Sequence, residues 1–311
     1  MLLPTILPQL APTAADPRPV LLAVAGPTAV GKTALTVALA QQLGTEIISA
    51  DSRQFYREMR IGTAKPTPAE MQGVPHHFVD SHSITDDYSA GRFATDALGL
   101  LEALFGRYPV VVATGGSGLY LQALTDGLDE LPPVPPPVRQ QLQHELQALG
   151  LPALVSELAR LDPVAHQRLD LHNSQRVLRA LEIVRGTGRP FSSFHRGPAA
   201  VAEAAAQRPF RVVKVALGRP REDVYARIDQ RVLAMLAEGL VAEAEALLPY
   251  RQHNALQTVG YQEIFGYLDG LYDYAEAVRL LQRNTRHYAK RQLTWLRRDA
   301  GYQWIGLSAN R

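Results

Sequence analysis

The sequence contains no cysteine among its 311 residues. This absence excludes disulfide bonds, thiolate metal sites and cysteine nucleophiles, and it suits a reducing cytoplasm, where we expect the protein to act. The sequence also lacks any apolar run near the about 20 residues that a membrane-spanning helix requires, so we expect no membrane association. The net charge of +2 is too small to indicate a partner by itself. Function must therefore be sought in local patterns.

The first 19 residues resemble an export signal only in their leucines. No Lys or Arg precedes the apolar residues, and Pro4 and Pro8 interrupt them. This pattern does not fit a signal peptide. We predict that residues 1–19 form a disordered extension.

Strand-like and helix-like segments alternate from Val20 to about Tyr120, which is typical of a parallel sheet with helices on both faces. From Leu131 a proline-rich stretch and several helical patterns follow, and no strand-like segment returns before Phe210–Gly218. We therefore predict an α/β fold with an all-helical insertion. The core would span residues 20–130, the insertion 131–207, and the second part of the core 208–311, ending in basic helices.

The segment after the first predicted strand matches the phosphate-binding pattern G-x-x-x-x-G-K-[ST]. Strand-like Val20–Ala25 precedes it and helix-like Ala34–Leu43 follows, which is the context that the pattern requires. In such a loop, backbone N–H groups and a lysine face an anion, and the Thr33 hydroxyl can bind Mg²⁺. The sequence predicts a P-loop NTPase-like sheet with Mg²⁺ as cofactor. The predicted phosphate-binding residues are Gly26, Pro27, Thr28, Ala29, Val30, Gly31, Lys32 and Thr33. The identity of the phosphorylated ligand is open at this point.

Two polar positions follow other predicted strands. Asp51 lies just beyond one strand, and ligands of open α/β sheets bind at the carboxyl ends of strands. Taken alone, Asp51 is better explained as a helix cap or turn residue. Ser117 lies among three glycines at another strand end, without the spacing or the histidine of a serine hydrolase. Their roles depend on the rest of the chain.

The last predicted helix is strongly basic. Between Arg279 and Arg298 the chain has no Asp or Glu, and it carries Arg279, Arg283, Arg286, Lys290, Arg291, Arg297 and Arg298. Helical spacing places most of them on one stripe of unpaired charge, opposite Tyr288 and Trp295. This pattern favours contact with a nucleic-acid backbone over an ordinary solvated helix. The insertion carries a second basic cluster, Arg176, Arg179, Arg185 and Arg189.

The order of the motifs GPTAVGKT, ISADSRQFY, IGTAKP, PHHFVDS, YSAGRF, GGSGLYLQAL, VGYQE and YAKRQLTWLRR resembles that of the tRNA dimethylallyltransferases. These bacterial enzymes prenylate an adenosine beside the anticodon. The resemblance runs from about Val20 to Trp304. It implies that the loop holds the diphosphate of dimethylallyl diphosphate, and that the acceptor is the N6 amine of adenosine 37.

The resemblance also implies roles for single residues. Asp51 corresponds to the general base, and Ser117 stands where the family usually has a threonine that assists the amine and the leaving oxygens. Lys32 and Arg231 would bind the diphosphate, whereas we expect Arg227 to be a solvated arginine paired with a nearby acid. The residues that would contact tRNA are Asp51, Ser52, Arg53, Gln54, Arg139, Gln175, Arg176, Arg179, Gln257, Gly260, Arg283, Lys290, Arg291 and Arg297. The insertion would clamp the anticodon stem-loop, and we expect a monomer.

Three other functions stay open from the sequence. A small-molecule kinase would use the same loop with ATP, and Asp80 is the acid that could serve its Mg²⁺. A related class of prenyltransferase acts on free AMP, although the basic stripe favours a polymeric acceptor. A non-catalytic RNA-binding NTPase would give no reason for Asp51 and Ser117.

Overall fold

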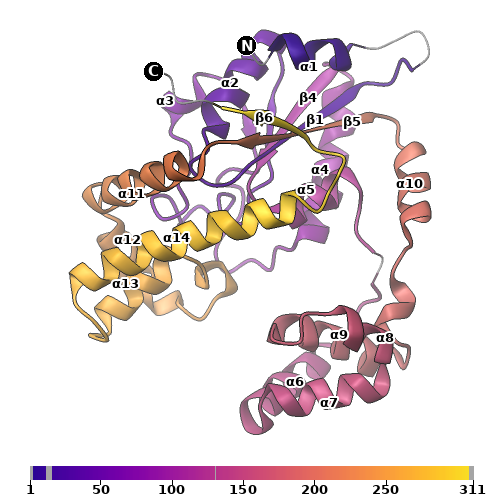
Figure 1. The fold of residues 1–311 in the computed structure, drawn as a ribbon, viewed down its shortest axis with the longest axis vertical. Coiled ribbons are helices and arrows are strands. Elements are labelled where there is room, and N and C mark those ends of the chain that lie inside the picture. Colours follow the sequence, from indigo (N-terminus) through magenta and orange to yellow (C-terminus); the bar gives the residue numbers. More distant parts are fainter. Residues whose placement is uncertain (1–2, 12–15, 130, 308–311) are drawn as a thin grey trace. The chain divides into compact units, whose positions relative to one another are not determined.

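The computed structural model describes residues 3–11, 16–129 and 131–307. These residues divide into two compact units (Figure 1). The first comprises Met1–Asp126 and Gln207–Arg311, and the second is Gly127–Ala206. The predicted insertion, residues 131–207, falls on the second unit apart from its last residue.

A six-stranded parallel sheet forms the centre of the first unit. Its order is β3-β2-β4-β1-β5-β6. The strands are β1 (Val20–Ala25), β2 (Ile47–Ser49), β3 (His76–His77), β4 (Val110–Gly115), β5 (Arg211–Gly218) and β6 (Gln303–Gly306). Val20 of β1 is in register with Val110 on one side and Arg211 on the other. All six residues of β1 are buried, as expected for the middle strand of a sheet covered on both faces. The predicted α/β fold class is confirmed.

The helices of the first unit lie between and beyond these strands in the sequence. They are α1 (Leu3–Leu10), α2 (Lys32–Leu43), α3 (Pro68–Met71), α4 (Ala90–Phe105), α5 (Gly118–Thr125), α11 (Arg221–Ala237), α12 (Leu240–Leu247), α13 (Tyr261–Leu268) and α14 (Tyr274–Leu296). Two 3₁₀ turns, η2 (Leu248–Tyr250) and η3 (Asn254–Leu256), connect α12 to α13. Among the described residues, no helix combines the length and apolar character needed to cross a bilayer.

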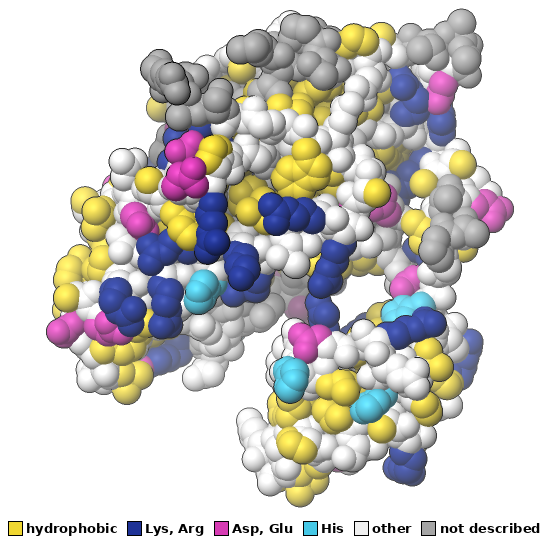
Figure 2. All heavy atoms as spheres, in the orientation of Figure 1, with side chains coloured by type: hydrophobic (Ala, Val, Ile, Leu, Met, Phe, Trp, Pro, Cys, Tyr) yellow, Lys and Arg dark blue, Asp and Glu magenta, His cyan; other side chains and the backbone are white. Residues whose placement is uncertain are grey.

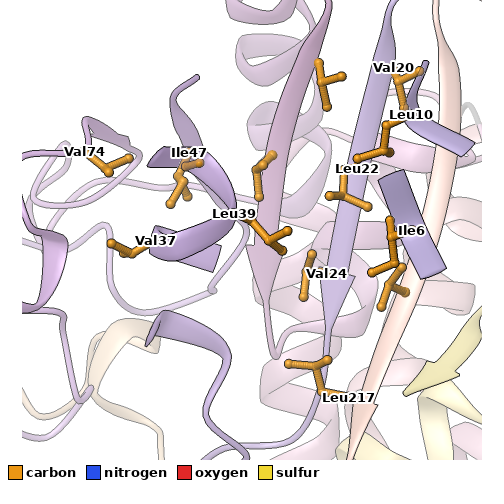
Figure 3. Packing of buried hydrophobic residues seen from close by; sticks show 14 of the residues in the cluster. Ile6, Leu10, Val20, Leu22, Val24, Val37, Leu39, Ile47, Val74 and Leu217 are labelled. Atoms are coloured by element: carbon orange, nitrogen blue, oxygen red, sulfur yellow. The ribbon is translucent and has the colours of Figure 1, made fainter. Parts of the chain in front are cut away.

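The N-terminal segment departs from the prediction of disorder. Residues Leu3–Leu10 form α1, and Ile6 and Leu10 are only 1% and 2% exposed. Figure 3 shows both side chains beside Val20 and Leu22 of β1. Helical spacing of Ile6 and Leu10 gives α1 one apolar face, and its burial outweighs the hydrogen bond that Pro8 cannot donate. The prediction was therefore wrong for residues 3–10; residues 1–2 and 12–15 lie outside the described part.

The C-terminal part of the core ends differently from the prediction of basic helices alone. After α14 the chain adds β6, which pairs in parallel with β5 from Val215–Gln303 to Gly218–Gly306. Only four residues make this edge strand, and its exposure pattern does not alternate. A segment so short carries little period-2 signal in the sequence.

The second unit contains only helices among its described residues. They are α6 (Pro136–Leu149), α7 (Leu151–Leu161), α8 (Pro163–Arg168), α9 (Ser174–Thr187), η1 (Phe191–Phe194) and α10 (Pro198–Ala206). Leu142, Leu158 and Leu181 belong to its own apolar core. Arg185 of α9 forms ion pairs with Glu145 of α6 and Glu157 of α7, at 2.6 and 2.5 Å. Arg185, which belongs to the second basic cluster, therefore joins α9 to α6 and α7.

Candidate active site

The phosphate-binding loop follows β1 and turns directly into α2. Gly31 has φ 106° and precedes the first residue of α2, Lys32. Glycine reaches this left-handed region without steric cost, which explains its place in the motif. Ala29 also lies there, with φ 63°, a strained conformation for a residue with a Cβ.

Lys32 lies inside this loop. Its Nζ donates hydrogen bonds of 2.9 Å to the carbonyl oxygens of Gly26 and Pro27. Burial lowers the pKa of Lys32 to about 8, while the Asp51 carboxylate opposes the shift and Arg231 adds to it. The lysine charge is therefore held at the loop, close to both of these groups.

Three arginines that follow β5 reach the same loop. Arg219 Nε donates to Val30 O at 2.8 Å, and Arg227 Nε donates to Ala29 O at 2.7 Å. Arg231 Nη1 donates to Thr28 Oγ1 at 3.3 Å, and burial, followed by repulsion from Arg227, lowers its pKa. The prediction that Arg227 is a solvated arginine was wrong, because its partner is a loop carbonyl. The loop is thus surrounded by cations, as an anion site requires.

Asp51 and Ser117 meet at the carboxyl ends of β2 and β4, which are adjacent strands. Asp51 Oδ1 accepts hydrogen bonds from the backbone N–H groups of Arg53 at 2.9 Å and Gln54 at 3.3 Å. Ser117 Oγ accepts one from Ser52 N at 2.9 Å and donates to Ser52 Oγ at 3.1 Å. One oxygen of Asp51 therefore stabilises a turn, as the simpler interpretation of this residue expects, while Oδ2 has no hydrogen bond within the described residues.

Helix α14 contributes two site residues that the sequence did not single out. Tyr288 lies near Ser117 and Asp51: burial raises the pKa of Tyr288 to about 12, the Asp51 charge adds to the rise, and the Ser117 hydroxyl opposes it. Gln292, one turn later, contacts the phosphate-binding loop. The sequence placed Tyr288 on the packing side of this helix, which hid its polar role. Gln292 lies four residues after Tyr288, on the same side of the helix, and a polar residue among apolar ones there could have indicated a role in the site.

Several predicted RNA-contacting residues use their polar groups within the protein. Gln54 Nε2 donates to Thr63 O at 3.2 Å and Ala64 O at 3.1 Å, while Arg53 Nη1 donates to Ser52 O at 3.1 Å. Gln257 Nε2 donates to Arg251 O at 2.7 Å. The Gln54 side chain thereby positions the IGTAKP segment.

The IGTAKP segment is also fixed by the second part of the core. Both oxygens of Glu243 on α12 accept hydrogen bonds from the backbone N–H groups of residues 60–62, at 2.8 to 3.0 Å. Tyr261 Oη donates to the same carboxylate at 2.7 Å. Gly260, in the VGYQE motif, donates its N–H to Glu263 at 2.8 Å. Two motifs that are far apart in the sequence thus form one surface.

The basic residues of α14 fall into two groups. Arg279 pairs with Glu276 at 2.6 Å, and Arg286 pairs with Asp229 of α11 at 2.5 Å. The predicted stripe of unpaired charge was wrong for these two. Within the part of the chain that the structure describes, no acid pairs with the exposed residues Arg283, Lys290, Arg291, Arg297 and Arg298. Figure 2 shows Lys and Arg side chains gathered over α14.

In the helical unit, the residues predicted to contact RNA lie on α6 and on the first two turns of α9. Arg139 of α6 and Arg179 of α9 flank the buried Glu182, at 3.4 and 3.0 Å. Gln175 and Arg176 are exposed at the start of α9. Glu182 therefore neutralises part of the charge of Arg139 and Arg179, whereas Gln175 and Arg176 are open to solvent.

The acids and the predicted metal ligand near the site can be compared with what a metal ion needs. Among the described residues, no group of three His, Cys, Asp or Glu side chains could hold a metal ion. Asp80, the acid that a kinase could use, is paired with Lys65. Thr33, the predicted metal ligand, is the second residue of α2 and directly follows Lys32 of the phosphate-binding loop.

Comparison with known families matches residues 54–299 to the model described as IPP transferase. The chain belongs to this family. A relative named tRNA dimethylallyltransferase, from Cytophaga hutchinsonii, is 50% identical over 284 residues, which is 91% of each chain.

Solved structures of IPP transferases agree with this membership. The tRNA isopentenylpyrophosphate transferase of Bacillus halodurans is 37% identical, with a TM-score of 0.67, covering 94% of this chain and 91% of that one. A eukaryotic dimethylallyltransferase acting on tRNA has a TM-score of 0.74, covering 93% of this chain and 74% of that one; at 24% identity it bears on the fold alone. The predicted family and its P-loop fold are confirmed.

Proposed function

We propose that this protein transfers the dimethylallyl group of dimethylallyl diphosphate to the N6 amine of adenosine 37 in tRNA, beside the anticodon, and releases diphosphate. The observation that carries the proposal is the meeting of a cation-rich phosphate loop with Asp51 and Ser117 in a member of the IPP transferase family. Relatives named tRNA dimethylallyltransferase support the choice of donor and acceptor.

The loop side of the site would bind the leaving group. As the allylic C–O bond breaks, its electron pair moves onto the diphosphate, whose negative charge increases. Loop N–H groups, Lys32 and Arg231 stabilise this charge, and Arg227 adds positive potential from one turn away. Thr33 would hold Mg²⁺, which when bound would neutralise part of the diphosphate charge.

The other side of the site would activate the acceptor. An exocyclic adenine amine is a weak nucleophile because its lone pair is delocalised into the ring. Its nitrogen forms the new bond to the allylic carbon, and its proton passes to Asp51 Oδ2, whose neighbour Oδ1 is held by two N–H groups. Ser117, held by two hydrogen bonds with Ser52, orients the amine and the leaving oxygens.

The tRNA would lie on the basic surfaces of both units. Exposed Arg283, Lys290, Arg291 and Arg297 suit backbone phosphates. Arg139, Gln175, Arg176 and Arg179 would contact the anticodon stem-loop, and Ser52, Arg53, Gln54, Gln257 and Gly260 would line its path to the site. An unstacked loop base can enter the pocket at low cost. We propose a monomer that acts in the cytoplasm.

The test is a product assay with the purified full chain. Unmodified tRNA, dimethylallyl diphosphate and Mg²⁺ should yield prenylated adenosine by nucleoside mass analysis, and a transcript with guanosine at position 37 should yield none. Parallel reactions offer AMP as acceptor or ATP with small-molecule acceptors. Product from AMP but not from tRNA would overturn the choice of acceptor, and ATP consumption without a prenylated product would support the kinase alternative.

A further inference from the structure

Gln292 is a polar residue on the buried face of α14. Its exposure is 7%, and the buried residues Ala289 and Leu296 lie on the same face of the helix, at 1% and 2%. A buried carboxamide destabilises a protein unless its donor and acceptor both find partners. The contacts of Gln292 therefore indicate what this residue does.

Each end of the carboxamide meets a different loop of the site. The Oε1 atom accepts a 2.8 Å hydrogen bond from Thr28 N, in the phosphate-binding loop after β1. The Nε2 atom donates a 2.9 Å hydrogen bond to Gly116 O, in the loop after β4. Because β1 and β4 are neighbours in the sheet, one side chain spans the gap between two adjacent strand ends.

These two contacts fall beside functional groups. Thr28 also accepts the hydrogen bond from Arg231, and Gly116 immediately precedes Ser117. The fit is tight, because a Cβ on Gly116 would lie 2.3 Å from Gln292 Nε2. The amide thus fixes the leaving-group side of the site against the acceptor side.

We propose that Gln292 is a positioning residue for prenyl transfer, and this inference rests on the function proposed above. Its carboxamide holds the phosphate-binding loop and the Ser117 loop at the spacing that aligns the allylic carbon between diphosphate and amine. Misplacement of reacting groups by about 1 Å can cost about 10²-fold in rate. Gln292 acts through Thr28 and Gly116 and does not touch the substrates.

The variant Gln292→Glu provides a pH-dependent test. Ionised glutamate has the shape of glutamine but no donor, so two acceptors would face each other at Gly116 O. Protonated glutamate again offers one donor and one acceptor. We expect its single-turnover transfer rate, divided by that of the wild type, to be reduced at least about tenfold at pH 8 and to recover as the pH falls to about 5.5.

Gln292→Met controls for charge, since it fills similar space without hydrogen bonds. We expect it to lose at least about tenfold in the same rate ratio, with no recovery at low pH and with tRNA affinity unchanged. A Gln292→Met variant as fast as the wild type would overturn the proposal, because the Gln292→Glu effect would then be charge repulsion alone. A flat Gln292→Glu ratio would also overturn it.

Gly116→Ala tests the same contact from the other side. The added Cβ should displace the amide and slow transfer in the wild-type background, but it should add little in a Gln292→Ala background. Additive losses would overturn the proposed bridge. Absence of prenyl transfer by the wild type itself would instead contradict the proposed function, so the two failures are distinguishable.

Discussion

The positive charges of this protein occur in two contrasting settings, the phosphate-binding loop and the outer face of α14. Around the loop, Lys32 and Arg231 are desolvated and donate to loop atoms. On α14, Arg283 and Lys290 are exposed and have no acidic partner among the described residues. The same residue types are therefore held rigidly in one place and left free in water in the other.

This difference separates two tasks. Buried charges act at full strength on a small anion that sits at one fixed point, and salt screens them little. Exposed charges suit a long polyanion, whose binding releases counterions and depends on salt. We therefore expect substitutions near the loop to change the chemical step, and substitutions on α14 to change tRNA affinity.

The largest expected effect is that of Asp51→Asn. Asparagine keeps the turn contacts to Arg53 and Gln54 but cannot take the amine proton, so single-turnover transfer should fall at least about a hundredfold. The melting temperature and tRNA affinity should stay near those of the wild type. Asp170→Asn is a matched control, because Asp170 makes a similar turn contact to His172 N in the helical unit. A loss of tenfold or less would remove Asp51 from the base role.

A second prediction uses the pKa of Lys32, which lies at about 8. Because the shift is downward, the lysine is charged at pH 7 and neutral at pH 9 in the free protein. The KM for dimethylallyl diphosphate should therefore rise about tenfold over this range, while tRNA affinity changes little. Lys32→Ala should have a high KM that no longer rises. If the variant keeps the same rise, another group causes it.

The third prediction concerns the outer face. Arg283→Ala with Lys290→Ala should weaken tRNA binding about threefold to tenfold and reduce the slope of log affinity against log salt by about 1.4 to 1.8. The transfer rate at saturating tRNA should be unchanged. An unaltered salt slope would mean that this face does not contact phosphates.

The smallest expected effect is that of Arg279→Ala on the same helix. Arg279 is already neutralised by Glu276, so its loss should change tRNA affinity less than about twofold. This variant is the matched control for the double substitution. If Arg279→Ala weakens tRNA binding as much as the double substitution does, then ion pairing with an acid does not decide which residues of α14 contact tRNA.

The sequence predicted the features that are written in contiguous residues. The phosphate-binding loop, the alternating strands and the helical insertion each have a local pattern, and Asp51 and Ser117 could be linked because parallel strands end on one side of a sheet. Partner choice was harder to predict. Asp229 was one of the nearby acids considered as a partner for Arg227, yet it pairs with Arg286 on another helix.

Elements that are stabilised by residues far away in the sequence were also missed, because no local pattern records such contacts. The α1 helix depends on burial against β1, and β6 depends on pairing with β5. Gln292 bonds to residues 264 and 176 positions away, which no local pattern reveals. Such contacts exist only once the chain has folded.

The middle position of β1 has a consequence for synthesis on the ribosome. This wholly apolar strand is complete by residue 25, but its neighbour β5 begins only at residue 211. At 5 to 20 residues per second, β1 waits about 10 to 40 s for that neighbour. Until then it exposes an unpaired edge that is prone to aggregation. The helical unit is made during this interval, so the time taken to translate residues 127–206 is part of the time for which the nascent chain needs protection by chaperones.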